Sequence, residues 1–373
     1  MKLTRLTSIA ALGAVAALTL AGCAANETAP DTDPGASAPA GEETTATLSG
    51  TIEATGASSQ GSAQEAWVAE FQTANPEANV LYEATGSGVG RDNFKAGASN
   101  FIGSDRAFKI EEIEEGGFGA CTSDDIVEVP NYISPIAVAF NLGDIETLNL
   151  DADTIAKIFN GDITSWDDEA IAALNEGVEL PATTITPVHR ADASGTQETF
   201  QNYLAATAPD VWTHEVSDEW PLQSGEGADG TSGVVDAIAA GDGYIGFADA
   251  SRTSELGQVA VQNGDEFISY SADAAAALVE ASPLEEGRQP HDLAFAVDPA
   301  AAPAGSYPIA LVSYLIGCVE YEDPEVASLV KGYFHFVTSE EGQQIGAEAA
   351  GAAPLSADLS AKVATAIDAI VTE

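Results

Sequence analysis

Short apolar runs alternate with amphipathic runs along most of this chain. Runs of about four to eight apolar residues are typical of strands, and apolar residues spaced three or four positions apart are typical of helices. The predicted strands are 48–55, 79–84, 101–104, 185–189 and 244–248. The predicted helices are 62–73, 91–98, 151–159, 167–174, 196–206, 233–240, 272–281, 324–337, 339–349 and 360–370. This alternation predicts an α/β fold with a largely parallel sheet.

Two further segments are almost wholly apolar. Residues 126–142 are interpreted as two extended stretches broken near Pro130 and Pro135, because proline has no N–H to donate to a sheet. Residues 307–316 have the same strand-like composition.

The first 22 residues have the pattern of an export signal. Lys2 and Arg5 precede the apolar run 6–20, which is too short for a stable membrane span. The run ends in Leu-Ala-Gly-Cys at residues 20–23, which resembles a bacterial lipobox. Cys23 is then expected to be the acylated first residue of an extracytoplasmic protein that is anchored to the membrane without spanning it. The alternative is an ordinary cleaved signal followed by a chance cysteine.

Residues 24–47 are rich in Ala, Thr, Glu, Pro, Asp and Gly and have almost no large apolar side chains. Such a segment cannot bury enough surface to offset the entropy of ordering it, so it is predicted to be a flexible tether. The folded part is expected to begin near residue 48 and is long enough for two domains of ordinary size.

The chain is strongly acidic, with a formal charge of −47. Removal of residues 1–22 leaves ten cations against 59 acids, a formal charge of −49. So few cations cannot form a basic face, which excludes nucleic acid as a partner. The same field repels anions, so any anion site must be local and built mainly from neutral donors.

Two cysteines remain besides Cys23. Cys121 and Cys318 form an even pair in an oxidising compartment, which predicts a disulfide between them. The alternative is two buried free thiols.

Three segments share one design, in which a strand ends, a turn of small polar residues follows and a helix begins. They are residues 56–61, 85–90 and 190–196. Each offers free backbone N–H groups and a short hydroxyl at a helix N-terminus, where an oxyanion is stabilised. For a single turn, plain helix capping by Ser or Thr is the favoured explanation. Three such turns favour a site, because the carboxyl ends of parallel strands meet at one crevice.

Two charged groups stand out near these turns. Arg190 opens the third turn, and its planar guanidinium could hold two oxygens of an oxyanion, with Asp192 fixing its rotamer. The alternative is a surface ion pair of little energetic value. Asp105 follows the apolar run 101–104 and is a second candidate, although it could equally be a helix N-cap.

The third turn, with the sequence RADASGT at residues 190–196, resembles the RADGSGT signature of the phosphate-binding subunit of the high-affinity phosphate ABC importer, the PstS family. Ala193 replaces the usual glycine. Residues 158–168 resemble the family's G-x-I-x-x-W-D-D segment, and 85–88, 103–105, 227–230 and 243–246 match further landmarks in the same order. The first turn departs most, because Ser58-Ser59 stands where the family often has Ala/Ser-Thr-Phe/Leu.

The resemblance implies a two-domain fold of the periplasmic-binding-protein type (type II) with two crossover strands, near 135–142 and 307–316. The first domain would comprise 48–134 and 312–373, and the second 139–303. The ligand would be inorganic phosphate, delivered to a membrane permease by a monomer without metal or cofactor. Carried over residue by residue, the ligands are the hydroxyls of Ser58, Ser87, Ser194 and Thr196, the N–H groups of Ser59 and Gly195, the cation Arg190 with its support Asp192, and the acceptor Asp105.

Two other functions remain open. A binding protein for another small oxyanion, such as sulfate or molybdate, would keep the fold and change the ligand. A secreted phosphatase-like hydrolase is disfavoured because its chemistry needs a metal or an activated nucleophile, whereas His189, His214, His291 and His335 are scattered along the chain. The G-x-G-x-x-G match at 225–230 is rejected as a nucleotide site, because no clear strand precedes it.

Overall fold

A computed structural model describes residues 48–373. Cys23, the predicted signal segment and the tether lie outside the described residues. The strands are β1 (Gly50–Gly56), β2 (Ala78–Glu83), β3 (Phe101–Ser104), β4 (Ile126–Asn141), β5 (Thr147–Leu150), β6 (Thr186–Arg190), β7 (Glu226–Ala228), β8 (Tyr244–Asp249), β9 (Gly257–Asn263), β10 (Glu266–Ile268) and β11 (Ala310–Cys318). The helices are α1 (Gly61–Ala74), α2 (Ser87–Ala96), α3 (Ile110–Glu115), α4 (Ala152–Asn160), α5 (Glu169–Leu174), α6 (Gly195–Thr207), α7 (Gly230–Ala240), α8 (Ala272–Ala281), α9 (Pro324–Thr338), α10 (Glu340–Ala350) and α11 (Ala357–Ile367).

The strands form two groups that share β4. In the first sheet β1 pairs in parallel with β2 and β3, and β3 and β4 pair antiparallel with β11. In the second sheet β6 pairs in parallel with β7 and β8, and β4 pairs antiparallel with β8 and β9. Parallel pairing is thus confirmed for the strands that precede the polar turns. The expectation of a largely parallel sheet is wrong around β4 and β11, because these strands run against their neighbours.

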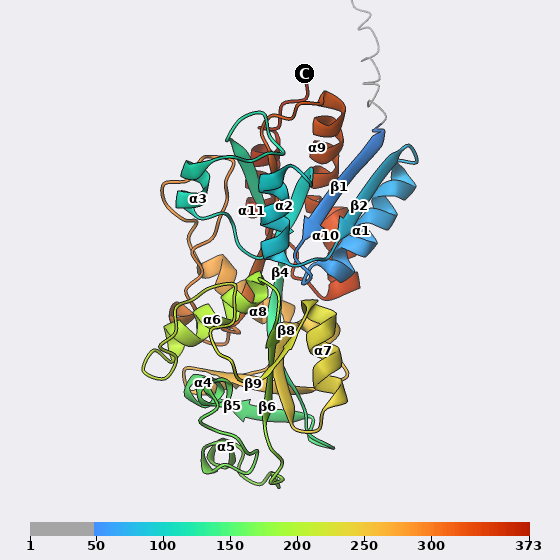
Figure 1. Cartoon of the computed structure of the whole chain (residues 1–373). Coiled ribbons are helices and arrows are strands. Elements are labelled where there is room, and N and C mark those ends of the chain that lie inside the picture. Colours follow the sequence, from blue (N-terminus) through green and yellow to red (C-terminus); the bar gives the residue numbers. More distant parts are fainter. Residues whose placement is uncertain (1–47) are drawn as a thin grey trace, which may run out of the picture. The chain divides into compact units, whose positions relative to one another are not determined.

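One continuous strand, β4, replaces the two stretches predicted for residues 126–142. It pairs with β11 up to Pro135 and with β8 from Ile136 onward, so it passes from the first sheet to the second (Figure 1). Pro135 lies at the transfer between partners. Pro130 lies beside an irregularity at which the register skips Asn131. Both prolines therefore sit where a missing N–H does not interrupt the ladder.

Large aromatic side chains fill the core on both sheets. On the first sheet Trp67 of α1 is buried and donates its indole N–H to the carbonyl of Gly342 on α10 at 2.6 Å. In Figure 1 these N-terminal and C-terminal helices, blue and red, lie together, in agreement with their contacts. On the second sheet Phe200 of α6 stacks on Phe247 of β8 at 4.1 Å between ring centroids. Packing of this kind explains why segments from the two ends of the chain build one layer.

Several element boundaries differ from the sequence-based expectation. Helix α2 begins at Ser87 rather than 91, α7 at Gly230 rather than 233, and α11 covers Ala357–Ile367 rather than 360–370. In the first two cases the polar turn itself forms the first helical turn. The short strands β5, β7, β9 and β10 were not predicted, because three to seven residues with exposed positions carry little periodicity.

Cys121 and Cys318 form a disulfide, with 5.3 Å between their Cα atoms, as the even pair predicted. It ties the loop after α3 to the end of β11. Among residues 48–373, no helix has the combination of length and hydropathy that a membrane crossing requires.

The buried Asp249 at the end of β8 should make the free energy of unfolding depend on pH. It is fully buried, accepts hydrogen bonds from Tyr132 and Ser134 of β4, and burial raises its pKa from 3.8 to about 6. Because the folded-state pKa is raised, its stabilising contribution is present at low pH and is lost as the pH rises through about 6. Between about pH 4 and pH 7 the wild type should lose about 2 kcal/mol of unfolding free energy relative to Asp249→Asn.

Denaturant unfolding of both proteins across this pH range measures the difference. The matched control is Asp210→Asn at an exposed position. Parallel stability curves for wild type and Asp249→Asn would contradict the prediction.

Candidate anion-binding site

The predicted polar turns converge at the ends of strands from both sheets. On the first-sheet side the N–H of Gly86 donates to the carbonyl of Gly56 at 2.8 Å, and the N–H of Ala57 donates to that of Gly103 at 2.8 Å. From the second-sheet side the carbonyl of Ala193 accepts the N–H of Gly88 at 3.1 Å. The turns at 56–61, 85–90 and 190–196 therefore meet at one place, as their shared design indicated.

Two glycines allow this close approach. Gly86 has φ +103°, and a Cβ there would lie 2.4 Å from Oδ2 of Asp192. A Cβ on Gly195 would lie 2.6 Å from the Cβ of Asp105. Any side chain at either position would push the two sides of the site apart.

Asp105 lies at the centre of the converging turns. It is only 6% exposed, and three hydroxyls donate to its carboxylate. Ser59 reaches Oδ1 at 2.5 Å, Ser313 reaches Oδ1 at 2.7 Å and Thr196 reaches Oδ2 at 2.8 Å. The backbone N–H of Asp105 in turn donates to Oγ of Ser87 at 3.0 Å. The buried charge is therefore stabilised by hydroxyl donors from both sides of the site.

Arg190 and Asp192 form the predicted pair. The guanidinium of Arg190 is buried, its Nε donates to Oδ1 of Asp192 at 2.7 Å, and its Nη2 donates to Oδ2. Burial alone would raise the pKa of Asp192, but the hydrogen bonds and charge of Arg190 outweigh it and lower this pKa. The pair is thus a half-buried two-point contact that fixes the guanidinium plane, and the alternative of a loose surface ion pair is wrong.

The remaining predicted residues lie around the same place. Ser194 is the N-cap of α6 and accepts the N–H of Gln197 at 3.3 Å. Gly195 and Thr196 form the first turn of that helix. Ser58 contacts the second side directly, where its Oγ lies 3.1 Å from Oγ1 of Thr231 and accepts the N–H of Thr231 at 3.2 Å.

A fourth turn was missed by the sequence reasoning. The segment 225–230, rejected as a nucleotide site because no strand precedes it, itself contains the three-residue strand β7, which ends at Ala228, and α7 begins at Gly230. Gly230 donates its N–H to Asp192 at 3.0 Å, and Thr231 contacts Ser58. The same strand–turn–helix design could have revealed it. Ser313 and Gln60 were also missed, and no local pattern distinguishes them from other strand and turn residues.

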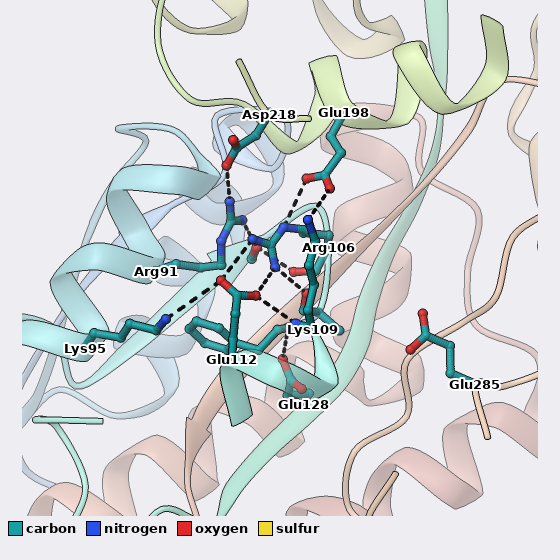
Figure 2. A network of polar contacts seen from close by, with 12 residues as sticks. Arg91, Lys95, Arg106, Lys109, Glu112, Glu128, Glu198, Asp218 and Glu285 are labelled. Carbon is teal, nitrogen blue, oxygen red and sulfur yellow. Dashed lines mark hydrogen bonds and ion pairs between the residues drawn. The ribbon is translucent and has the colours of Figure 1, made fainter. Parts of the chain in front are cut away.

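Ion pairs join the two sides at the rim of the site (Figure 2). Arg91 of α2 reaches Asp218 at 2.5 Å, and Arg106 reaches Glu198 of α6 at 3.0 Å. Lys109 lies 3.7 Å from the same Glu198. The backbone carbonyl of Asp218 accepts the N–H of Ser194 at 2.9 Å, so the Arg91 pair also supports the third turn.

A carboxylate on the first-sheet side completes this rim. Glu112 contacts Arg106 at 2.6 Å and the N–H of Lys109 at 2.8 Å. Burial alone would raise the pKa of Glu112, but these hydrogen bonds lower it to about 2. Burial likewise opposes the charge of Arg106, and Glu112 and Glu198 overcome this and raise its pKa. Both groups are therefore charged at neutral pH. A cavity of about 480 Å³ is lined by Arg106, Lys109 and Glu198 and reaches Asp105.

These features define a class of protein. Residues 41–341 match the family model described as the PBP superfamily domain, and the chain belongs to that superfamily, whose fold is the two-domain periplasmic-binding-protein fold predicted from the sequence. Solved structures that share the fold include the following two. The phosphate-binding protein PfluDING matches with TM-score 0.70 and 21% identity over 84% of this chain and 93% of that one. A phosphate ABC transporter substrate-binding protein from Clostridium perfringens, described as putative, matches with TM-score 0.59 and 20% identity over 82% of this chain and 100% of that one.

Curated relatives narrow the class to one family. Phosphate-binding protein PstS 3 of Mycobacterium leprae is 33% identical over 327 residues, which cover 86% of this chain and 87% of the relative. PstS3 of Mycobacterium bovis (strain BCG) is 32% identical over 380 residues and covers 99% of this chain and 100% of the relative. The chain belongs to the PstS family, as the motifs indicated.

The ion pairs at the rim should contribute to the free energy that holds the two sides of the site together. Glu198→Gln removes the charge that Arg106 and Lys109 share across the site, and a half-buried pair of this kind is worth about 1 kcal/mol. The N–H of Gly88, which donates to Ala193 across the site, should then exchange with solvent about fivefold faster. Hydrogen–deuterium exchange of peptides covering 86–90 measures the rate in the ligand-free protein. Exposed Glu70→Gln on α1 is the control, and equal rates in the two variants would contradict the prediction.

Proposed function

We propose that this protein binds inorganic phosphate outside the cytoplasm and delivers it to the membrane permease of an ABC importer. The observation that carries the proposal is the convergence of hydroxyl and N–H donors from both sides of the site around one buried carboxylate, Asp105, with the guanidinium of Arg190 fixed nearby. The names of the PstS relatives, all phosphate-binding proteins, support the same ligand.

The ligands proposed are those of the sequence-based expectation. Phosphate oxygens would accept hydrogen bonds from Ser58, Ser87, Ser194, Thr196, the N–H groups of Ser59 and Gly195, and Arg190, with Asp192 holding the guanidinium. The hydroxyls of Ser59 and Thr196, which donate to Asp105, would turn to the anion when it enters. Neutral donors suit this task in a chain of charge −47, because they attract an anion only at short range.

Asp105 explains how phosphate would be selected. A phosphate that keeps a proton can donate a hydrogen bond to the carboxylate, whereas sulfate at neutral pH has no proton to donate. Sulfate would place an unprotonated oxygen against a buried negative charge, an unpaired contact with a penalty of at least ~1–3 kcal/mol. Selectivity would thus come from a penalty on the wrong ligand.

The domain assignment belongs to the same proposal. The first domain would comprise 48–134 and 312–373, the second 139–303, and phosphate would hold them closed by contacting both. The transfer of β4 from β11 to β8 at Pro135–Ile136 supports a boundary there. Cys23 would carry the lipid that anchors a monomer to the membrane.

A phosphatase-like hydrolase is the alternative from another class. Within residues 48–373 each histidine contacts a different partner, namely Arg190, Asn160, Asp125 and Asp368. In the same part of the chain no group of three or more His, Cys, Asp or Glu side chains is placed to hold a metal ion. Hydrolysis of a model phosphate ester by the protein, measured with added divalent metals, would favour the enzyme.

Isothermal titration with phosphate, sulfate and arsenate tests the proposed ligand. Phosphate should bind with a stoichiometry of about one, and sulfate should not bind measurably. Phosphate and arsenate are chemically too similar for this site to separate strongly. Tight sulfate binding and no phosphate binding would instead identify a receptor for another oxyanion.

Asp105→Asn should relax the discrimination against sulfate. The amide removes the buried negative charge and can donate a hydrogen bond to an unprotonated oxygen, so sulfate affinity should rise by about tenfold or more. Titration with sulfate checks this, with the exposed Asp236→Asn as control. The selectivity account is wrong if sulfate binding stays negligible in a folded Asp105→Asn protein.

Arg190→Ala should weaken phosphate binding by about 2–5 kcal/mol, because it removes a buried charge-assisted contact and leaves Asp192 without its cation. Arg190→Lys keeps the charge but not the two-point geometry, and should fall between wild type and Arg190→Ala. Calorimetry measures both, and the exposed Arg252→Ala serves as control. Unchanged affinity in Arg190→Ala would move the site elsewhere.

A further inference from the structure

A series of buried polar side chains runs from Asp105 through Ser313 of β11 to Gln60, near the end of the turn 56–61. Ser313 of β11 is fully buried, and its hydroxyl donates to Oδ1 of Asp105 at 2.7 Å. The side-chain amide nitrogen of Gln60, also fully buried, donates to Oγ of Ser313 at 2.5 Å. Gln60 therefore donates to Ser313 and Ser313 donates to Asp105, so this series of hydrogen bonds ends at the carboxylate.

The orientation of Gln60 is fixed by its surroundings. Its Oε1 accepts hydrogen bonds from Gln64 at 2.9 Å and from Asn131 at 3.0 Å. Its Nε2 lies 3.4 Å from the carbonyl oxygen of Tyr314, where an amide oxygen would face another acceptor. Because Nε2 must point to Ser313, the Ser313 oxygen accepts from Gln60 and its proton is directed to Asp105.

Ser313 is held in place more firmly than the other two hydroxyls that donate to Asp105. Ser59 and Thr196 belong to polar turns whose groups are proposed phosphate ligands, so they are free to exchange Asp105 for the anion. Ser313 lies on a central strand between β3 and β4, and its position there is held by Gln60. It is therefore the donor expected to stay on Oδ1 if the hydroxyls of Ser59 and Thr196 turn to the anion.

We propose that Ser313, oriented by Gln60, is a positioning residue for ligand selection: it holds Oδ1 of Asp105 and leaves Oδ2 as the acceptor for the proton of the bound oxyanion. The inference rests on the proposed function. A carboxylate anchored at one oxygen cannot rotate freely, so the second oxygen is oriented before the ligand arrives. On that bond Oδ1 is the acceptor, because the hydrogen atom belongs to Ser313.

The test is a double-mutant cycle on the full-length mature protein, with inorganic phosphate as the titrated ligand. Ser313→Ala should weaken phosphate binding about tenfold, the effect of losing one hydrogen bond to a charged group. In an Asp105→Asn background the same change should weaken binding less than about twofold, because the carboxylate that Ser313 orients is absent. A purely structural role for Ser313 would give the same factor in both backgrounds.

Ser134→Ala is the matched control. Ser134 is buried on the neighbouring strand and donates to a different buried carboxylate, Asp249, so the chemical change is the same and phosphate affinity should not move. Ser313→Cys keeps nearly the same volume with a weaker donor, and should lie between wild type and Ser313→Ala. It provides the measurement if Ser313→Ala does not fold.

Two results would overturn the role of Ser313 alone: unchanged phosphate affinity in Ser313→Ala or Ser313→Cys, or equal weakening with and without Asp105. A wild-type protein that binds no phosphate would overturn the proposed function together with this inference. The wild-type titration therefore tells the two failures apart.

Discussion

The arrangement of this protein depends on one buried negative charge at the place where its donors converge. A desolvated carboxylate is unfavourable unless hydrogen-bond donors surround it. Asp105 receives three hydroxyls, from α6, from β11 and from the turn before α1. Each donor comes from a different element, so the charge can be satisfied only when all three elements are in place. The carboxylate thus links the two sheets.

The chain as a whole is strongly acidic, but several of its few cations gather at the rim of the site. The described part of the chain carries ten cations, and four of them, Arg91, Lys95, Arg106 and Lys109, lie together at the rim. Each is paired with a carboxylate, so the rim is not a free basic patch. The long-range electrostatic potential therefore remains negative, and an anion is favoured only where hydroxyls and N–H groups bind it directly.

Two kinds of contact hold the sides of the site together. The rim ion pairs are half-buried and contribute modestly. The backbone contact of Gly88 with Ala193 and the approach of Gly195 to Asp105 leave no space for side chains, so they require the turns to fit closely. A ligand that bonds to donors from both sides would add to these contacts, which is how two-domain receptors couple binding to closure.

The sequence by itself predicted the main helices and strands and the polar turns that the structure brings together. The strand–turn–helix pattern placed Ser87 and Thr196 in or beside polar turns that lead into helices and Arg190 at the end of a strand, because local hydrogen bonding strongly constrains which residues begin a helix. Only the tertiary structure decided that β4 is continuous through Pro130 and Pro135, and that Ser313 and Gln60 stand behind Asp105. These depend on which strands become neighbours, and a contact between residues about 200 positions apart leaves no periodic trace in the chain.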